Sequence, residues 1–599
     1  MKVVDVHTYA KPDEAVVTHL DWEAKVDFDQ KIIEGKATLS IKAADDASEI
    51  ILDANGLKIE KVTLGDDEVE TEFSLGEDDR LMGQPLKIKI EPDTKKVNVY
   101  YSTTEGAQAL QWLTPEQTAD KTRPFLFTQS QAILARSWIP IQDSPGIRFT
   151  YTAKVTVPND LLALMSANNP QEKNAEGVYH FEMKQPIPAY LMALSVGDVS
   201  FKSLGERTGV YAESSVVEAA AYEFAELEDM VKVAESLYGP YQWERYDLIV
   251  LPPSFPFGGM ENPRLTFATP TILAGDRSLT SLVAHELAHS WSGNLVTNAT
   301  WDDFWINEGF TVYFEHRIME ALYGRDYSEM LASLSLQGLK DEIEEMINEG
   351  KAVDTHLKLN LKGRSPDEGV TAIAYDKGYF FLRFLEEKVG KDTFDVFLKE
   401  YFSSNAFKVM TTEGFIEYMD KNLFKKNGLE ADKTIYEQWI YGPGLPADSP
   451  IPVSDRFTKV DEALTSWQNG TAPGELATSE WSSHEWLHFI RALPEDIAFD
   501  QMKALDSAFG FTASKNSEVF SAWMIHAIRH QYEDAYDELE AFLIKTGRRK
   551  FLSPIYGEMI KTEAGKQMAL RIYEKARPNY HFVSTNTLDE MLGLSEGQG

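Results

Sequence analysis

Two histidines and one glutamate in the middle of the chain constrain the fold more than any other feature of the sequence. His285 and His289 lie four residues apart in SLVAHELAHSW, whose apolar residues follow helical spacing. Both imidazoles therefore project from one helix face, about one turn apart. Eighteen residues separate His289 from Glu308, which opens a second helical pattern, WINEGFTVYFEH. A fold that packs these two helices antiparallel brings Glu308 back over the histidines, and we expect such a fold.

The residue types at these positions indicate a zinc site. Two imidazoles one turn apart can reach one zinc ion at about 2.0–2.1 Å, and a catalytic zinc takes three protein ligands and keeps one open position. We predict one Zn²⁺ per chain, held by His285, His289 and Glu308. Glu286 stands beside the metal as the candidate general base. Glu315, two turns after Glu308, can hold the second nitrogen of a ligand histidine.

The pentapeptide HExxH does not identify the site by itself, because the chain contains it twice. A second copy spans residues 484–488, and His526 and His530 form a third pair at the same spacing. No helix that could supply a third ligand follows the second copy, and Pro494 interrupts the pattern soon after it. We therefore predict that residues 484–488 form an ordinary helix, with histidines that have no metal role.

Charge and composition exclude several classes of protein. The net charge is −37, so a nucleic-acid or anionic-membrane surface is not expected. There is no cysteine, which excludes thiolate ligands and a cysteine nucleophile. No stretch approaches the roughly 18 apolar residues of a membrane helix. The first residues lack the apolar run of a signal peptide. We expect a cytoplasmic protein, and a monomer.

At 599 residues the chain exceeds what one hydrophobic core supports, so a multidomain α+β protein is expected. Alternating apolar residues such as Ala37, Leu39 and Ile41 predict strands in an N-terminal β domain, residues 1–201. Helical patterns dominate the rest, with Gly547 a plausible C-cap of one helix. We predict a mainly α catalytic domain at 202–442, a proline-rich linker at 443–454 and a helical domain at 455–599.

Several motifs together resemble one enzyme family. GGMEN (258–262), HELAH (285–289) and WINEGF (305–310) occur in the order and spacing of the gluzincin zinc aminopeptidases. RPFLFTQSQA (123–132) and GRRKF (547–551) resemble the branch that contains leukotriene A(4) hydrolase and aminopeptidase B. The resemblance extends over essentially the whole chain. It implies an N-terminal antiparallel β saddle, a thermolysin-like catalytic domain and a superhelical C-terminal domain, with the active site between them.

The resemblance also implies a function: a zinc aminopeptidase that releases N-terminal residues from short peptides with a free amino end. Glu261 resembles the family's carboxylate for the α-amino group, and Gln131 a second partner for it. The neighbouring Gly258, Gly259 and Met260 correspond to the family's substrate-binding segment. The two glycines would let the substrate backbone approach closely.

Four further residues receive roles from the same resemblance. Tyr375 resembles the tyrosine that stabilises the oxyanion of the tetrahedral intermediate. Arg548 and Lys550 resemble the basic pair that holds the carboxylate end of small peptides. Asp367 matches an aspartate of the family, and aminopeptidase B relatives favour basic first residues, which this aspartate could help to bind.

Departures from the family pattern leave alternatives open. Val370 stands where leukotriene A(4) hydrolase has a tyrosine used in epoxide opening, which argues against epoxide hydrolysis. A non-catalytic binding protein of the same fold would usually lack a ligand or the base, and all four residues are present here. An endopeptidase is disfavoured by Glu261, which suits a free amino end.

Overall fold

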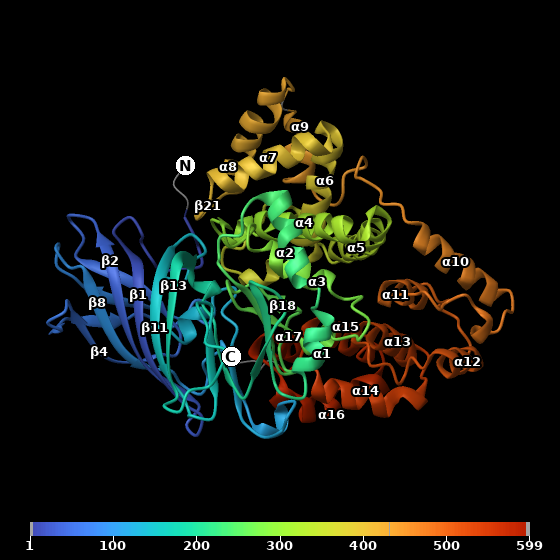
Figure 1. The fold of residues 1–599 in the computed structure, drawn as a ribbon, viewed down its shortest axis with the longest axis horizontal. Helices are drawn as coiled ribbons and strands as arrows, with labels where there is room; N and C mark the ends of the chain where they lie inside the picture. Colours follow the sequence, from blue (N-terminus) through green and yellow to red (C-terminus); the bar gives the residue numbers. More distant parts are fainter. Residues whose placement is uncertain (1–3, 431, 595–599) are drawn as a thin grey trace.

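The first part of the chain folds into β-sheets in the computed structural model, which describes residues 4–430 and 432–594 (Figure 1). One sheet has the strand order β13-β11-β1-β2-β8-β4-β5. Its neighbouring described strands are antiparallel apart from the parallel pair β1 and β11. Ala37, Leu39 and Ile41 are buried on one face of β2, as their alternation predicts. The strands are β1 (Ala15–Asp27), β2 (Ile32–Ala43), β4 (Lys58–Leu64), β5 (Val69–Glu70), β8 (Lys96–Ser102), β11 (Arg148–Thr156) and β13 (Val178–Pro188).

Two smaller sheets complete the N-terminal part. Their strand orders are β12-β14-β10-β9 and β3-β7-β6. The chain leaves β10 only three residues before Gln131, so this sheet positions that side chain for the site described below. The strands are β3 (Glu49–Ala54), β6 (Phe73–Leu75), β7 (Gln84–Lys89), β9 (Leu110–Leu113), β10 (Phe125–Thr128), β12 (Leu162–Met165) and β14 (Leu194–Gly197).

The middle part combines a mixed sheet, β15-β16-β17-β19-β18, with helices. The sheet contains β15 (Ser200–Ser203), β16 (Thr208–Ala212), β17 (Tyr246–Val250), β18 (Gly259–Met260) and β19 (Thr266–Ala268). β15 crosses the limit predicted at residue 201 and pairs with β16. A short parallel pair joins β20 (Val296–Asn298) to β21 (Lys408–Met410). The helices are α1 (Val217–Glu223), α2 (Leu227–Tyr238), α3 (Ser281–Ala288), α4 (Trp305–Tyr323), α5 (Arg325–Asn348), α6 (Gly378–Val389), α7 (Lys391–Ser404), α8 (Thr412–Met419) and α9 (Lys433–Trp439).

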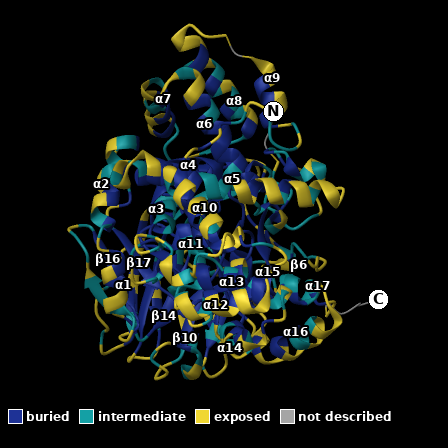
Figure 2. Cartoon of the chain, turned by 90° about the vertical axis from the view of Figure 1, so that its right-hand side faces the viewer, coloured by how far each residue is buried: buried dark blue, intermediate teal, exposed yellow. Residues whose placement is uncertain are grey.

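The last part is helical and follows a segment without helix or strand, residues 443–454, where the proline-rich linker is predicted. Figure 2 shows exposed residues along α10, α12 and α14, whose other residues are buried or intermediate, the pattern of amphipathic helices on a core, whereas α11 and α13 are largely covered. The helices are α10 (Asp455–Gln468), α11 (Ser483–Arg491), α12 (Phe499–Phe509), α13 (Ser517–Arg529), α14 (Tyr536–Lys545), α15 (Arg549–Met559), α16 (Glu563–Ala576) and α17 (Phe582–Met591).

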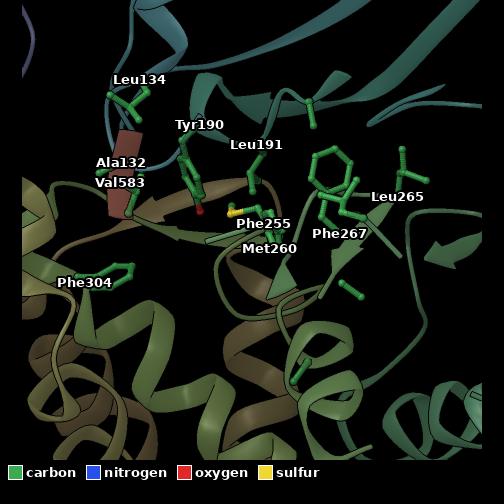
Figure 3. Close-up of a cluster of buried hydrophobic side chains, with 14 of the residues drawn as sticks. Ala132, Leu134, Tyr190, Leu191, Phe255, Met260, Leu265, Phe267, Phe304 and Val583 are labelled. Atoms are coloured by element: carbon green, nitrogen blue, oxygen red, sulfur yellow. The ribbon is translucent and has the colours of Figure 1, made fainter. Parts of the chain in front are cut away.

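The three parts share a buried apolar cluster. Figure 3 shows Tyr190 and Leu191 of the N-terminal part beside Phe255 and Met260 of the middle part, with Val583 of α17 at the edge. The remaining labelled members are Ala132, Leu134, Leu265, Phe267 and Phe304. This common core fixes the parts relative to one another, which a site built from all three requires.

His581 reinforces the same junction. It is fully buried, and its ring stacks on Phe127 with centroids 6.0 Å apart. Its Nδ1 accepts a hydrogen bond from the N–H of Val583 and so caps α17. Its Nε2 lies 3.4 Å from the carbonyl oxygen of Ala109. Both contacts are made by the neutral ring, and burial lowers the pKa of His581 to about 4.

One local prediction is wrong. Gly547 does not cap a helix: α14 ends at Lys545, and Thr546 is the capping residue. The glycine is required for another reason. A Cβ at this position would lie 2.5 Å from the carbonyl oxygen of Ser254, so only glycine allows the two backbones to approach. No helix among the described residues is long and apolar enough to cross a membrane.

Candidate zinc centre and peptide cleft

Helices α3 and α4 bring together the three predicted metal ligands. His285 lies in α3, His289 is the residue that ends it, and Glu308 lies in the first turn of α4. The Nε2 atoms of the two histidines are 3.2 Å apart. Glu308 Oε2 lies 3.3 Å from Nε2 of His285 and 3.5 Å from Nε2 of His289. The connection between the helices contains β20, so it is longer than a simple turn.

These separations fit a zinc ion. Ligand atoms about 2.0–2.1 Å from a tetrahedral centre lie about 3.3–3.4 Å from one another. The three measured separations fall between 3.2 and 3.5 Å. Glu308 is only 2% exposed, and its Oε2 has no hydrogen-bond partner among the described residues. Two imidazoles and one carboxylate are also a ligand set typical of catalytic zinc.

The outer nitrogens of both histidines are held in the state that metal binding requires. His285 Nδ1 donates to Glu315 Oε2 at 3.1 Å, the contact predicted for Glu315. His289 Nδ1 donates to the carbonyl oxygen of Ser292 at 3.1 Å, and Thr311 Oγ1 lies at the same distance. With the proton on Nδ1, each Nε2 presents its lone pair to the shared point.

Two further carboxylates converge on this point. Oxygens of Glu261 and Glu286 lie within 4.8 Å of each other and of a ring nitrogen of His289. Each side chain is buried and keeps one oxygen without a hydrogen-bond partner among the described residues. Burial raises the pKa of Glu286 to about 8 and raises that of Glu261 as well. Buried acceptors without partners are costly, so they indicate positions that a ligand or water completes.

Gly259 leaves the space that Glu286 occupies. A Cβ at Gly259 would lie 2.3 Å from Glu286 Oε1, closer than any real contact allows. Edge strand β18 therefore runs against the carboxylate of Glu286 because residue 259 has no side chain. The neighbouring Gly258 faces Leu282 and Arg548 instead. Both glycines line the cleft. The lack of a side chain at each position leaves room for the neighbouring side chains of the site.

All of these groups line one cavity of about 850 Å³. Its wall includes Gln131, Tyr375, Asp367, Arg548 and Lys550, so the structure brings these predicted residues to the same cleft. The Nε2 of Gln131 is buried without a partner among the described residues. Burial raises the pKa of Asp367, and no hydrogen bond to its carboxylate is found in the described chain.

Tyr375 stands directly over the metal ligands. It lies in a π-helical turn, Ile373–Lys377, of the kind that often marks functional sites. Its ring stacks on His285 at 12° with centroids 6.0 Å apart. Burial, followed by the charges of Glu308 and Glu261, raises the pKa of Tyr375 well above its usual value. The phenol therefore stays protonated and can donate a hydrogen bond.

In the wall of the same cavity, a buried glutamate of α13 holds the basic pair. Lys550 Nζ lies 2.6 Å from Glu518 Oε1, and Arg548 lies 3.7 Å from the same oxygen. Arg548 also donates to Thr271 Oγ1 at 2.9 Å. Burial opposes the charge of Glu518, but the two cations outweigh it and hold its pKa at about 2. Arg548, Lys550 and Glu518 together carry a net positive charge, which suits a carboxylate ligand.

The comparisons with known proteins agree with this architecture. Residues 16–191 match the peptidase M1 N-terminal domain, 222–439 the peptidase family M1 domain, and 481–592 the C-terminal domain of leukotriene A4 hydrolase. A leukotriene A-4 hydrolase of Xenopus laevis is 36% identical over 99% of this chain and 100% of that protein. The chain belongs to peptidase family M1.

Other M1 relatives extend the likeness. Leucine aminopeptidase 2 of Pyricularia oryzae is 35% identical over 100% of this chain and 99% of that protein. Among solved structures, yeast LTA4 hydrolase in complex with bestatin superposes with a TM-score of 0.89 at 30% identity, over 98% and 97% of the two chains. Family membership confirms the predicted fold and the predicted class of enzyme, a hydrolase that cleaves peptides.

Not every residue of the predicted substrate-binding segment, residues 258–260, faces the cleft. The side chain of Met260 is buried in the common core, where Gln129 Nε2 lies 3.3 Å from its sulfur (Figure 3). Met260 is absent from the cavity wall, so any contact with a substrate would involve its main chain alone. Its side chain serves packing between the N-terminal and middle parts.

The second HExxH motif forms a helix, α11, as predicted. Its histidines face different surroundings: His488 stacks on Phe457 with centroids 4.1 Å apart and lies 2.8 Å from Asp461 Oδ1. Glu485 caps the helix through Ser482. Among the described residues, no third ligand lies near His484 and His488. Both groups of described side chains that could hold a metal ion include His289 instead.

Several residues of the cavity wall were not predicted from the sequence, among them Asp376, His484, Arg491 and Glu518. Burial raises the pKa of Asp376 to about 7. Its place next to Tyr375 in the sequence is the signal that could have identified it. Only the π-helical turn, however, brings both side chains to the cavity. The others come from α11 and α13, whose approach to the zinc centre depends on the packing of the C-terminal helices.

Proposed function

We propose that the chain is a zinc-dependent aminopeptidase that removes the N-terminal residue from short peptides with a free amino group. One observation supports this most strongly: a ligand triangle with zinc spacing beside two buried, unpartnered carboxylate oxygens, on Glu261 and Glu286. An aminopeptidase needs one carboxylate to accept the proton of the attacking water and a second to bind the α-ammonium group of the peptide. The relatives named leucine aminopeptidase support the same activity.

His285, His289 and Glu308 would hold the zinc ion, which when bound polarises the scissile carbonyl and acidifies a water molecule. Glu261 would bind the α-ammonium group through its unpartnered oxygen. An ammonium group needs oxygen acceptors, and the amide of Gln131, whose nitrogen is unpaired among the described residues, would present its oxygen when the amide group is turned over. Together these contacts would place the first peptide bond, and no later one, next to Glu286.

Glu286 would take a proton from the attacking water and return it to the leaving amine. Burial raises the pKa of Glu286, a direction that suits a group that accepts and then releases a proton. The hydroxyl of Tyr375 would donate a hydrogen bond to the developing oxyanion. Arg548 and Lys550 would bind the far carboxylate of a short peptide, and Asp367 lines the region open to a basic side chain.

The proposal is tested with aminoacyl nitroanilides, each free and N-acetylated, before and after chelation and restoration of zinc. Cleavage of the free-amine substrates alone, stopped reversibly by chelation, is the expected result, and the panel then identifies the preferred first residue. The Glu286→Gln variant should keep zinc and lose turnover. Cleavage of acetylated substrates would instead support an endopeptidase, and substantial turnover by Glu286→Gln would refute the base assignment.

Epoxide hydration needs separate consideration, because relatives carry the name leukotriene A-4 hydrolase. Val370 lines the cavity and brings no hydroxyl group there. We therefore expect the purified protein not to hydrate fatty-acid epoxides. Detectable hydration would overturn this expectation without affecting the peptidase assignment.

A further inference from the structure

One face of α11 lines the cavity although the proposed mechanism makes no use of it. His484, Leu487 and Arg491 all belong to the cavity wall, at the i, i+3, i+7 spacing of one helix face. His488, in the same motif, contacts Phe457 and Asp461 instead. Figure 2 shows α11 between α10 and α13, with the middle part above it. The second HExxH motif thus contributes one histidine to the cleft and directs the other away from it.

His484 is built into this wall with an unused hydrogen-bonding atom. The residue is 7% exposed, and its Nδ1 has no partner among the described residues. The edge of its ring packs near Tyr327, with centroids 6.1 Å apart. Burial lowers the pKa of His484 to about 4, so the ring is neutral at physiological pH. A neutral imidazole facing a cavity can donate or accept one hydrogen bond.

A second imidazole of the wall is in the same condition. His316 of α4 is 4% exposed, and its Nδ1 is likewise unpartnered in the described chain. Its ring is held by stacking on Tyr379, with centroids 4.3 Å apart. Five leucines from α3 and the segment before it, from α5 and from α11 also line the cavity: Leu279, Leu282, Leu331, Leu334 and Leu487. The lining therefore combines apolar side chains with unsatisfied ring nitrogens.

His484 shares the cavity wall with groups linked to both ends of the proposed binding mode. Glu518, which holds Lys550, and Glu315, the partner of His285, line the same cavity. In the proposed binding mode the amino end of a tripeptide is at Glu261 and its carboxylate at Lys550. The residue between these two ends is the second one, so its side chain is the part of the substrate that passes His484.

We propose that the α11 face is the subsite for the side chain of the second peptide residue, and that His484 hydrogen-bonds the polar tip of that side chain. The inference rests on the proposed function, because it uses the direction in which an aminopeptidase binds a peptide. A side chain with an apolar body and a polar end fits this lining, as tyrosine does. Phenylalanine would fill the same space and leave the ring nitrogen unsatisfied.

The test compares two tripeptides that share the first residue preferred in the nitroanilide panel and end in alanine, with tyrosine or phenylalanine in second position. Wild-type protein should favour the tyrosine peptide by about 5–10-fold in kcat/KM, mainly through KM. In His484→Leu this ratio should fall to about one, and His484→Gln should restore part of it. His488→Leu, in the same motif but facing Asp461, is the matched control and should keep the wild-type ratio.

Binding of the same two peptides to Glu286→Gln protein, measured by calorimetry with and without His484→Leu, separates this inference from the activity. A tyrosine preference in binding that disappears with His484→Leu supports the subsite. A wild-type ratio of one, or a ratio that His484→Leu leaves unchanged, overturns the inference while cleavage of free-amine substrates still supports the aminopeptidase. Absence of all cleavage refutes the proposed function instead, and the binding ratio still decides the role of His484.

Discussion

Replacing Gly259 by alanine should displace the general base without removing the metal. The new Cβ would lie 2.3 Å from Oε1 and 2.4 Å from Cδ of Glu286. An ordinary contact needs about 3.4 Å, so the carboxylate has to move by about 1 Å. The three atoms nearest to this Cβ all belong to Glu286, so we expect the carboxylate to move rather than the proposed ligands His285, His289 and Glu308.

The expected effect of Gly259→Ala follows from the chemistry of a misplaced base. A displacement of about 1 Å costs roughly 10²-fold in rate, and complete loss of a general base costs roughly 10²–10⁴-fold. We expect kcat on the preferred nitroanilide to fall by about 10²-fold or more, towards that of Glu286→Gln. Zinc content, measured by atomic emission, should remain one ion per chain, and the melting temperature should change little.

Gly258→Ala is the matched control for this substitution. Its Cβ would meet the ends of two flexible side chains, Leu282 at 2.5 Å and Arg548 at 2.7 Å, and these can shift. We expect kcat to stay within a few fold and KM for short peptides to rise, since Arg548 is displaced. Wild-type kcat in Gly259→Ala would refute the placement of Glu286, and loss of zinc would show that the strand supports the metal ligands rather than the base.

Three more predictions follow from single contacts. Glu315→Ala removes the acceptor of His285 Nδ1 and should weaken zinc binding by about 10–100-fold in a chelator competition. Tyr375→Phe should lower kcat by about 10²–10³-fold with little change in KM; an unchanged kcat would exclude the oxyanion role. Burial lowers the pKa of His581 from 6.5 to about 4. As the pH falls, the unfolded chain therefore binds a proton at this residue before the folded chain does, and the folded state loses stability between about pH 6.5 and pH 4. Between pH 7 and pH 5 this loss is about 2 kcal/mol, and calorimetric melting of His581→Asn should show a correspondingly weaker dependence on pH.

The grouping of the proposed zinc ligands could be predicted from the sequence because each part of the pattern is local. The spacing of His285 and His289 follows from the helical repeat, and Glu308 and Glu315 begin the next helix pattern. The sequence does not show how close β18, the strand of Gly259, lies to the carboxylate of Glu286. That approach depends on the pairing of β18 with β19, a tertiary feature.

The prediction for the second HExxH motif is confirmed for the helix and was incomplete about the cleft. Periodicity shows that residues 484–491 share a helix, but not which face that helix turns to the cavity. His484 and His488 are one turn apart and yet differ in surroundings, because α10 covers one and the cavity borders the other. The same limit explains why Gly547 was misread: its neighbour Ser254 is nearly 300 residues away in sequence.

The contributions of the three parts imply that metal chemistry and peptide recognition can be varied separately. The proposed ligands, the proposed base and Glu315 all come from α3 and α4, so we expect zinc binding to depend on the packing of these two helices. The contacts proposed for the remainder of the peptide come from elsewhere: Gln131 follows β10, and His484 and Lys550 belong to C-terminal helices. A change in α11 or α15 should therefore alter which peptides are cleaved before it alters whether the bond can be cleaved, whereas a change in α3 or α4 should do the reverse.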